Sequence, residues 1–96
     1  MLLGSSASAM TAAELLQDES AFATGYVFGI VEYNVSVGTF DDERFLRRRQ
    51  CLIDTKANAK TFLEMTKNFI RRNPTTLPEP ASSAVLRAII EMCAKT

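Results

Sequence analysis

The sequence contains no histidine, and only two of its 96 residues are cysteine. The lack of histidine removes the usual proton shuttle at neutral pH, the commonest metal ligand and the usual base that activates a serine or cysteine nucleophile. Two cysteines without histidine also make a poor zinc site. No motif places paired carboxylates, or a serine with a lysine, for the mechanisms that remain. We therefore expect a binding protein that is not an enzyme and that uses no cofactor.

The sequence also lacks net charge and long apolar runs. Eleven basic residues balance eleven acidic ones, so no net field attracts nucleic acid or an anionic membrane. No segment is long and apolar enough to span a bilayer. We therefore expect neither nucleic acid nor membrane as a partner, and recognition by a local surface instead.

The first nine residues have a composition of their own. The segment from Leu2 to Ala9 resembles the end of a secretory signal, and Ala7-Ser8-Ala9 fits the small-x-small cleavage pattern. Residues 1–9 are thus expected to be a signal-peptide remnant or a flexible tail, and residues 10–96 a single domain. A domain of this size has a modest core, so a covalent link would help to stabilise it.

Helical signals fill the first half of the domain. Thr11 and Glu14 form a capping box that opens a short helix ending near Gln17. The next helix is expected to end near Val37 and to be apolar over most of its circumference, as a central or intersubunit helix would be. Gly25 and Gly29, four apart, suggest a flat patch that another helix approaches closely. The stripe expected to run down this helix consists of Phe22, Tyr26, Gly29, Ile30, Tyr33 and Val37.

Three further helices are expected in the second half. A short one spans about residues 41–50, and its three adjacent arginines should fan out around the helix. Asp54 or Thr55 then caps a long helix that ends at Asn73-Pro74. After a proline-rich connector, Pro80 opens the last helix. The fold class is therefore all-α, a compact bundle of four to five helices with a C-terminal helical hairpin.

The two cysteines bracket this hairpin. Cys51 lies before the long helix and Cys93 ends the last one. Both helices have expected lengths of roughly 25 Å, so folding them back on each other brings the two sulfurs together. We expect a Cys51–Cys93 disulfide if the protein is exported, and two buried thiols if it stays in the cytosol.

The run from Phe22 to Cys93 resembles the small helical immunity proteins of type VI secretion, which neutralise peptidoglycan amidase effectors. Ala23-Thr24-Gly25-Tyr26-Val27-Phe28-Gly29 is similar to the family's glycine-containing helix. Cys51, the end of the long helix at Phe69 to Pro74, and the segment from Pro80-Ala81 to Cys93 follow in the family's order. Two positions depart from the pattern, since Ala23 replaces a cysteine and Asn73 a histidine.

The resemblance implies a periplasmic protein, acting as a homodimer, that binds a cognate secreted amidase and obstructs its active site. A loop or helix end would enter the cleft. The turn at Gly38 to Glu43 and the connector from Asn73 to Pro80 are both available, and the first is favoured. Taken singly, Phe40 can also pack beneath the helix, and the acids can serve only as caps. The expected contact residues are Thr39, Phe40, Asp41, Asp42, Glu43, Arg47 and Asp54.

Two other functions fit the same composition. A periplasmic stress chaperone would expose apolar helix surface after acidification, and without histidine its switch would depend on carboxylates at low pH. An assembly subunit of an envelope complex would use the apolar helix near residues 22–37 as its contact surface.

Overall fold

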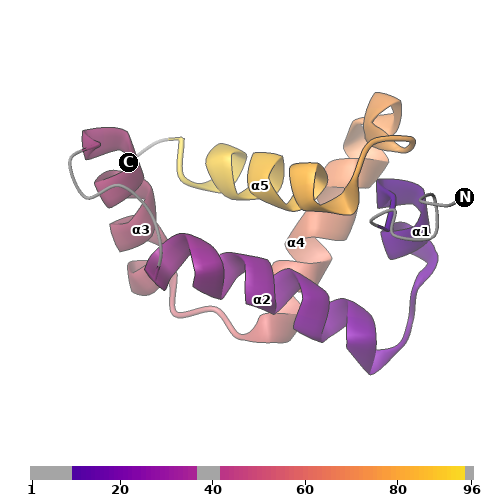
Figure 1. The fold of residues 1–96 in the computed structure, drawn as a ribbon, viewed down its shortest axis with the longest axis horizontal. Helices are drawn as coiled ribbons and strands as arrows, with labels where there is room; N and C mark the ends of the chain where they lie inside the picture. Colours follow the sequence, from indigo (N-terminus) through magenta and orange to yellow (C-terminus); the bar gives the residue numbers. More distant parts are fainter. Residues whose placement is uncertain (1–9, 37–41, 95–96) are drawn as a thin grey trace, which may run out of the picture.

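The computed structural model describes residues 10–36 and 42–94. The described chain forms five α-helices and one short 3-10 helix, with no β-strand among these residues, which confirms the all-α fold class. The helices are α1 (Ala12–Gln17), α2 (Ala21–Ser36), α3 (Glu43–Thr55), α4 (Ala59–Arg72) and α5 (Ala81–Met92), and η2 (Pro74–Thr76) lies in the connector. In Figure 1, α3 and α1 lie at opposite ends of the molecule, and α4 crosses behind α2 and α5.

The start of the domain is bound to the proline connector. In the capping box, Glu14 N–H donates to the Thr11 hydroxyl at 3.1 Å, and Thr11 N–H donates to the Glu14 carboxylate at 2.8 Å. The first amides of α1 donate to connector carbonyls, and Ala81 N–H at the start of α5 donates to Met10 O at 2.7 Å. These bonds satisfy amides that a helix start leaves without an internal partner. Carbonyl groups of the connector backbone therefore already accept hydrogen bonds from the start of the domain.

The core-facing side of α2 differs from the one that the sequence suggested. Ala23, Val27 and Val31 are buried, whereas Phe22 and Tyr33 are each 62% exposed. The expected stripe therefore lies partly at the surface, at Phe22 and Tyr33, and the buried face of α2 is formed by smaller residues spaced four apart. Choosing between two apolar faces on one helix requires knowing where its neighbours lie.

The two glycines of α2 do not approach another helix within the described chain. A Cβ built at Gly25 or Gly29 meets no atom within 4 Å. The expectation of a close helix contact at this patch is therefore wrong for the chain's own described helices. The patch lies open on the surface of α2.

The third helix is longer than expected and contains Cys51. Asp42 caps its start, and its carboxylate accepts from Arg44 N–H at 2.9 Å. The helix continues to Thr55 and ends at Lys56, which adopts a left-handed conformation with φ of 54°. Asn58, not Asp54 or Thr55, then caps α4 by accepting from Thr61 N–H at 2.8 Å. The expected boundary between these two helices was wrong.

Helices α4 and α5 supply most of the core. The buried apolar residues of α4 are Phe62, Leu63, Phe69 and Ile70, and those of α5 are Ala81, Ala84, Val85, Ala88 and Ile89. The helix end at Asn73-Pro74 and the α5 start after Pro80 agree with the sequence prediction. Lys67 is also buried in α4, where its ammonium group donates to Asp18 O at 2.9 Å and so joins α4 to the segment between α1 and α2.

Candidate functional site

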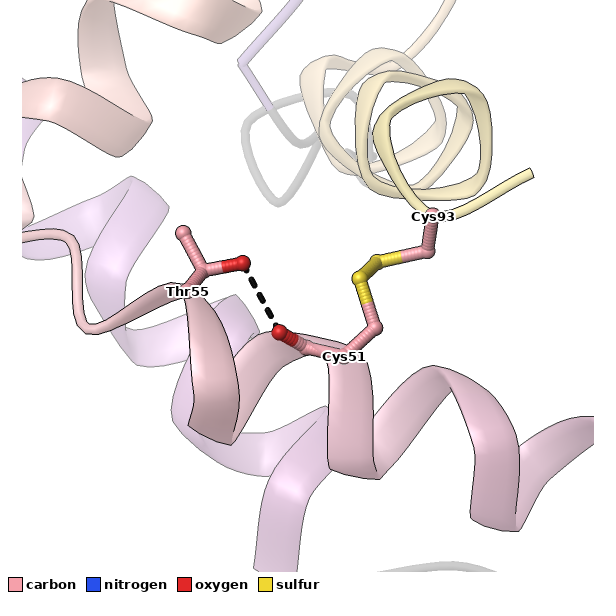
Figure 2. The surroundings of a disulfide bond; sticks show 3 residues. All are labelled: Cys51, Thr55 and Cys93. Atoms are coloured by element: carbon pink, nitrogen blue, oxygen red, sulfur yellow. Dashed lines mark hydrogen bonds between the residues drawn. A yellow bond between two sulfur atoms is a disulfide. The ribbon is translucent and has the colours of Figure 1, made fainter. Parts of the chain in front are cut away.

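The disulfide joins two helices that are far apart in sequence. Cys51 and Cys93 are bonded, with their Cα atoms 5.9 Å apart, which confirms the expected pair. Figure 2 shows that Cys51 lies on α3, where its carbonyl accepts from the Thr55 hydroxyl, and that Cys93 lies at the end of α5. The bond therefore attaches α3 to α5, and it does not close the α4–α5 pair directly as the expected helix boundaries implied.

The exposed side of α3 carries several of the expected contact residues. Thr39, Phe40 and Asp41 lie outside the described residues. Glu43, Arg47, Gln50 and Asp54 are all exposed and recur at spacings of four, three and four, so they share one face of α3. We call these four residues the polar strip. The structure thus brings Glu43, Arg47 and Asp54 onto one surface.

Neighbouring members of the polar strip interact in pairs. Arg47 forms an ion pair with Glu43 at 3.6 Å, and Gln50 donates to the Asp54 carboxylate at 2.8 Å. The Glu43 side chain is 86% exposed, so solvent screens the ion pair, which adds little stability. Asp42 differs from the strip because it is the N-cap of α3 and accepts from Arg44 N–H. Its capping role confirms the structural alternative for this residue, and a contact role stays a prediction.

The three adjacent arginines of α3 point to different surroundings, as the sequence predicted. Arg47 belongs to the polar strip. Arg49 turns toward α2, where its Nε donates to Val35 O at 2.7 Å near the end of that helix. Arg48 is half-buried and faces the end of α5, where it lines a pocket with Arg44 and Cys93. Arg47 also lines this pocket, and it is the only one of the three that is exposed.

Arg44 and Arg48 were missed as candidate site residues by the sequence analysis. Arg44 precedes Cys51 by seven positions and Arg48 by three, so all three share the face of α3 that meets α5. This spacing predicts a shared face only if Cys51 belongs to the same helix as the two arginines. Placing Cys51 before a separate helix removed that phase relation.

A second charged site joins α4 and α5. Arg72 donates to both carboxylate oxygens of Glu91, at 2.7 and 3.2 Å, and its guanidinium lies 5.9 Å from the ring centre of Phe69. The hydrogen bonds from Arg72 hold the pKa of Glu91 below its ordinary value of 4.5. The same pairing raises the pKa of Arg72. This two-point ion pair fixes the surface between the two helices.

An apolar groove of about 520 Å³ lies between α2 and α5. Its lining includes Gly29, Ile30 and Tyr33 from α2 and Leu86 from α5. Gly29 and the exposed Tyr33 therefore line the same groove. It is separate from the polar strip, which lies on α3.

Comparisons with family models, curated proteins and solved structures gave no match to this chain. In the described part of the chain, no group of three cysteine or carboxylate side chains is arranged to hold a metal ion. No helix in residues 10–36 or 42–94 has the length and apolar character needed to cross a membrane.

Proposed function

We propose that this chain is an immunity protein that binds a peptidoglycan amidase delivered by type VI secretion and blocks its active-site cleft. The observation that carries the proposal is the position of the residues behind the family resemblance. Cys51 and Cys93 join α3 to α5, Pro74 follows the end of α4, and Pro80 precedes α5. These residues fix the junctions of the helical scaffold, and they leave the exposed face of α3 free to vary with the toxin.

The proposed inhibitory surface is the polar strip together with the turn that precedes α3. Helix α3 is held on one side by the buried Phe45 and Leu52 and on another by the disulfide. A helix fixed in this way loses little conformational entropy when it enters a cleft, and this limits the cost of binding. Charges of both signs on the strip would pair with complementary groups and exclude other partners.

The proposed compartment is the periplasm. Disulfides form and persist in the oxidising periplasm and are rare in the cytosol. The Cys51–Cys93 bond supports this compartment because it forms and persists where the surroundings are oxidising. An amidase that cleaves peptidoglycan acts in the same compartment, so inhibitor and toxin would meet there.

We further propose that the protein is a homodimer that pairs through α2. Gly25 and Gly29 leave open space on a helix that carries one charged residue, Glu32, and Phe22 and Tyr33 flank them with exposed rings. A second copy of the same face supplies apolar surface without unpaired charge, which suits a twofold contact. Sedimentation equilibrium should give twice the chain mass, and Gly29→Leu should shift the protein toward the monomer. A monomer at every concentration tested would rule out this arrangement.

Co-expression tests the inhibitory function directly. The chain is exported to the periplasm of a cell that also exports a type VI peptidoglycan amidase encoded beside it, and lysis is followed by culture density. We expect lysis to be suppressed by the chain and to proceed without it. Equal lysis in both cultures would refute the immunity function.

A pair of matched variants then tests the surface. Glu43→Gln with Arg47→Gln removes an acid and a base spaced four apart on α3. Lys60→Gln with Glu64→Gln makes the same change on the exposed side of α4. We expect only the α3 variant to lose protection, while both keep the helical content and thermal midpoint of the parent. If both protect fully, the polar strip is not the contact surface.

A further inference from the structure

The pocket between α3 and the end of α5 has an unusual combination of walls. It has a volume of about 330 Å³ and is lined by Arg44, Arg47 and Arg48 from α3, and by Ile90, Cys93 and Ala94 from α5 and its end. We call it the arginine pocket. Three arginine residues thus line the same opening as an isoleucine that is 46% exposed. Basic and apolar recognition elements lie within one opening.

Arg48, one of the residues that line this pocket, has a hydrogen-bond donor without a partner in the described part of the chain. Its Nε is buried and has no hydrogen-bond partner among the described residues. Buried donors are nearly always paired in folded proteins, so an unpaired one indicates an acceptor that the described residues do not supply. An oxyanion is the acceptor that guanidinium groups bind best, because its two oxygens match the two parallel donors of arginine.

We propose that the arginine pocket receives a carboxylate side chain of a partner protein, with an apolar partner residue packing on Ile90. Asp42 and Glu43 lie 3.8 and 3.6 Å from guanidinium nitrogens of Arg44 and Arg47 at the same end of α3. Their charges repel an extended polyanion or an anionic lipid surface, while one carboxylate between the arginines is well compensated. An acidic residue beside an apolar one in a protein segment fits both walls.

The pocket depends on the disulfide for its shape. Its two walls come from α3 and α5, which the Cys51–Cys93 bond joins (Figure 2). Cys93 is itself one of the lining residues. The C-terminal end of α5 carries partial negative charge, which favours nearby arginines without any ligand. These arginines could therefore serve only to stabilise the end of α5, and the test must distinguish this role from binding.

This inference rests on the proposed function for the identity of the partner, since the partner would be the toxin. The probe does not require the toxin. Protein labelled with ¹⁵N is titrated with acetyl-Gly-Glu-Leu-Gly-amide, and with the matched peptide that has glutamine in place of glutamate. Arginine Nε–H signals are followed by NMR, with Arg71 and Arg87 as internal references outside the pocket.

We expect saturable shifts at Arg44, Arg47 and Arg48 with the glutamate peptide, and none with the glutamine peptide. Arg48→Gln should weaken binding at least about tenfold, as for loss of a hydrogen bond to a charged group. Arg44→Gln gives an independent variant at a side chain that is 84% exposed, so its effect is free of folding defects. Arg87→Gln, which removes a positive charge paired with Glu79 at 3.1 Å on α5, should leave binding unchanged.

Three results would overturn the proposal. Equal shifts with both peptides, or shifts no larger than those of Arg71 and Arg87, would leave only the structural role at the α5 end. Tighter saturation by inorganic phosphate, or by vesicles containing anionic lipid, would assign the pocket to a different anion. Full protection by Arg48→Gln in the co-expression assay would remove the pocket from the toxin interface. Failure of the unmodified chain to protect would refute the immunity function instead, while the peptide titration would still judge the pocket.

Discussion

Breaking the Cys51–Cys93 bond should remove a large part of the stability of this domain. The two cysteines are 42 positions apart. On the chain-entropy model, a crosslink over that separation lowers the entropy of the unfolded chain by an amount worth about 4 kcal/mol at 25 °C. Domains of this kind have total unfolding free energies of roughly 5–15 kcal/mol. The reduced protein is therefore expected to keep only about 1–11 kcal/mol of that free energy.

The loss should be concentrated in α3. This helix buries only Phe45 and Leu52, whereas α4 buries four apolar side chains together with Thr66 and Lys67. Regions with few buried apolar contacts open locally at a lower free energy than the core. Hydrogen exchange in the reduced protein should therefore accelerate first in the amides of α3, and those of α4 should keep protection up to global unfolding.

Urea titration measures the effect, with oxidised and reduced wild-type protein compared at equal concentration. The reduced protein keeps both side chains, so the difference isolates the bond, and Cys51→Ala with Cys93→Ala serves as a second form without it. A difference in the free energy of unfolding below about 1 kcal/mol, with unchanged exchange in α3, would refute the argument. It would mean that the unfolded chain is already restricted or that α3 is held by its packing alone.

Four other substitutions test features of the helices. Gly29→Ala should raise the free energy of unfolding of the monomer by about 0.5–1 kcal/mol, measured by urea titration at low protein concentration, because a Cβ there meets nothing within 4 Å. Val27→Ala should cost about 2 kcal/mol and Tyr33→Ala less than about 0.5 kcal/mol in the same assay, and the reverse order would contradict the assignment of the buried face. Glu91→Gln should reduce the decrease of the thermal midpoint that acidification causes. Because the pKa of Glu91 is lowered in the folded protein, its pair with Arg72 contributes fully to the free energy of unfolding above pH 4.5. That contribution is lost as the pH falls through the pKa that Glu91 has in the folded protein. The same acid dependence in the variant and the parent would contradict this role.

Local signals in the sequence predicted the ends of several helices because those ends are made by neighbouring residues. The capping box of Thr11 and Glu14 forms as its spacing requires. Asn73-Pro74 ends α4, since a proline cannot continue the helix at that point. Pro80 precedes α5 for the related reason that a helix start needs no proline N–H. Each of these signals is complete within four residues.

The boundary between α3 and α4 could not be predicted in the same way. Helix α3 ends at Lys56 in a left-handed conformation, where glycine or asparagine is the usual residue. Asp54 and Thr55 looked like caps, yet both continue the helix, and the Thr55 hydroxyl donates to the carbonyl of Cys51. Contacts of α3 with α2 and the disulfide thus outweighed the local preference for a cap at Asp54 or Thr55. Because the sequence prediction ended the helix too early, it placed Cys51 outside α3.

The prediction that Cys51 lies outside α3 also explains why Arg44 and Arg48 were missed. The expected contact residues came mostly from an acidic turn. Glu43, Arg47 and Asp54 among them share one surface only because α3 continues to Thr55 and aligns Glu43 with Asp54. The same continuity places Arg48 beside the disulfide and gives it an unpaired Nε. A protein whose partners vary can change the outward faces of α3 without altering Phe45, Leu52 or Cys51. The disulfide thus separates the residues that maintain the fold from those available for recognition, and helix phase within α3 decides which is which.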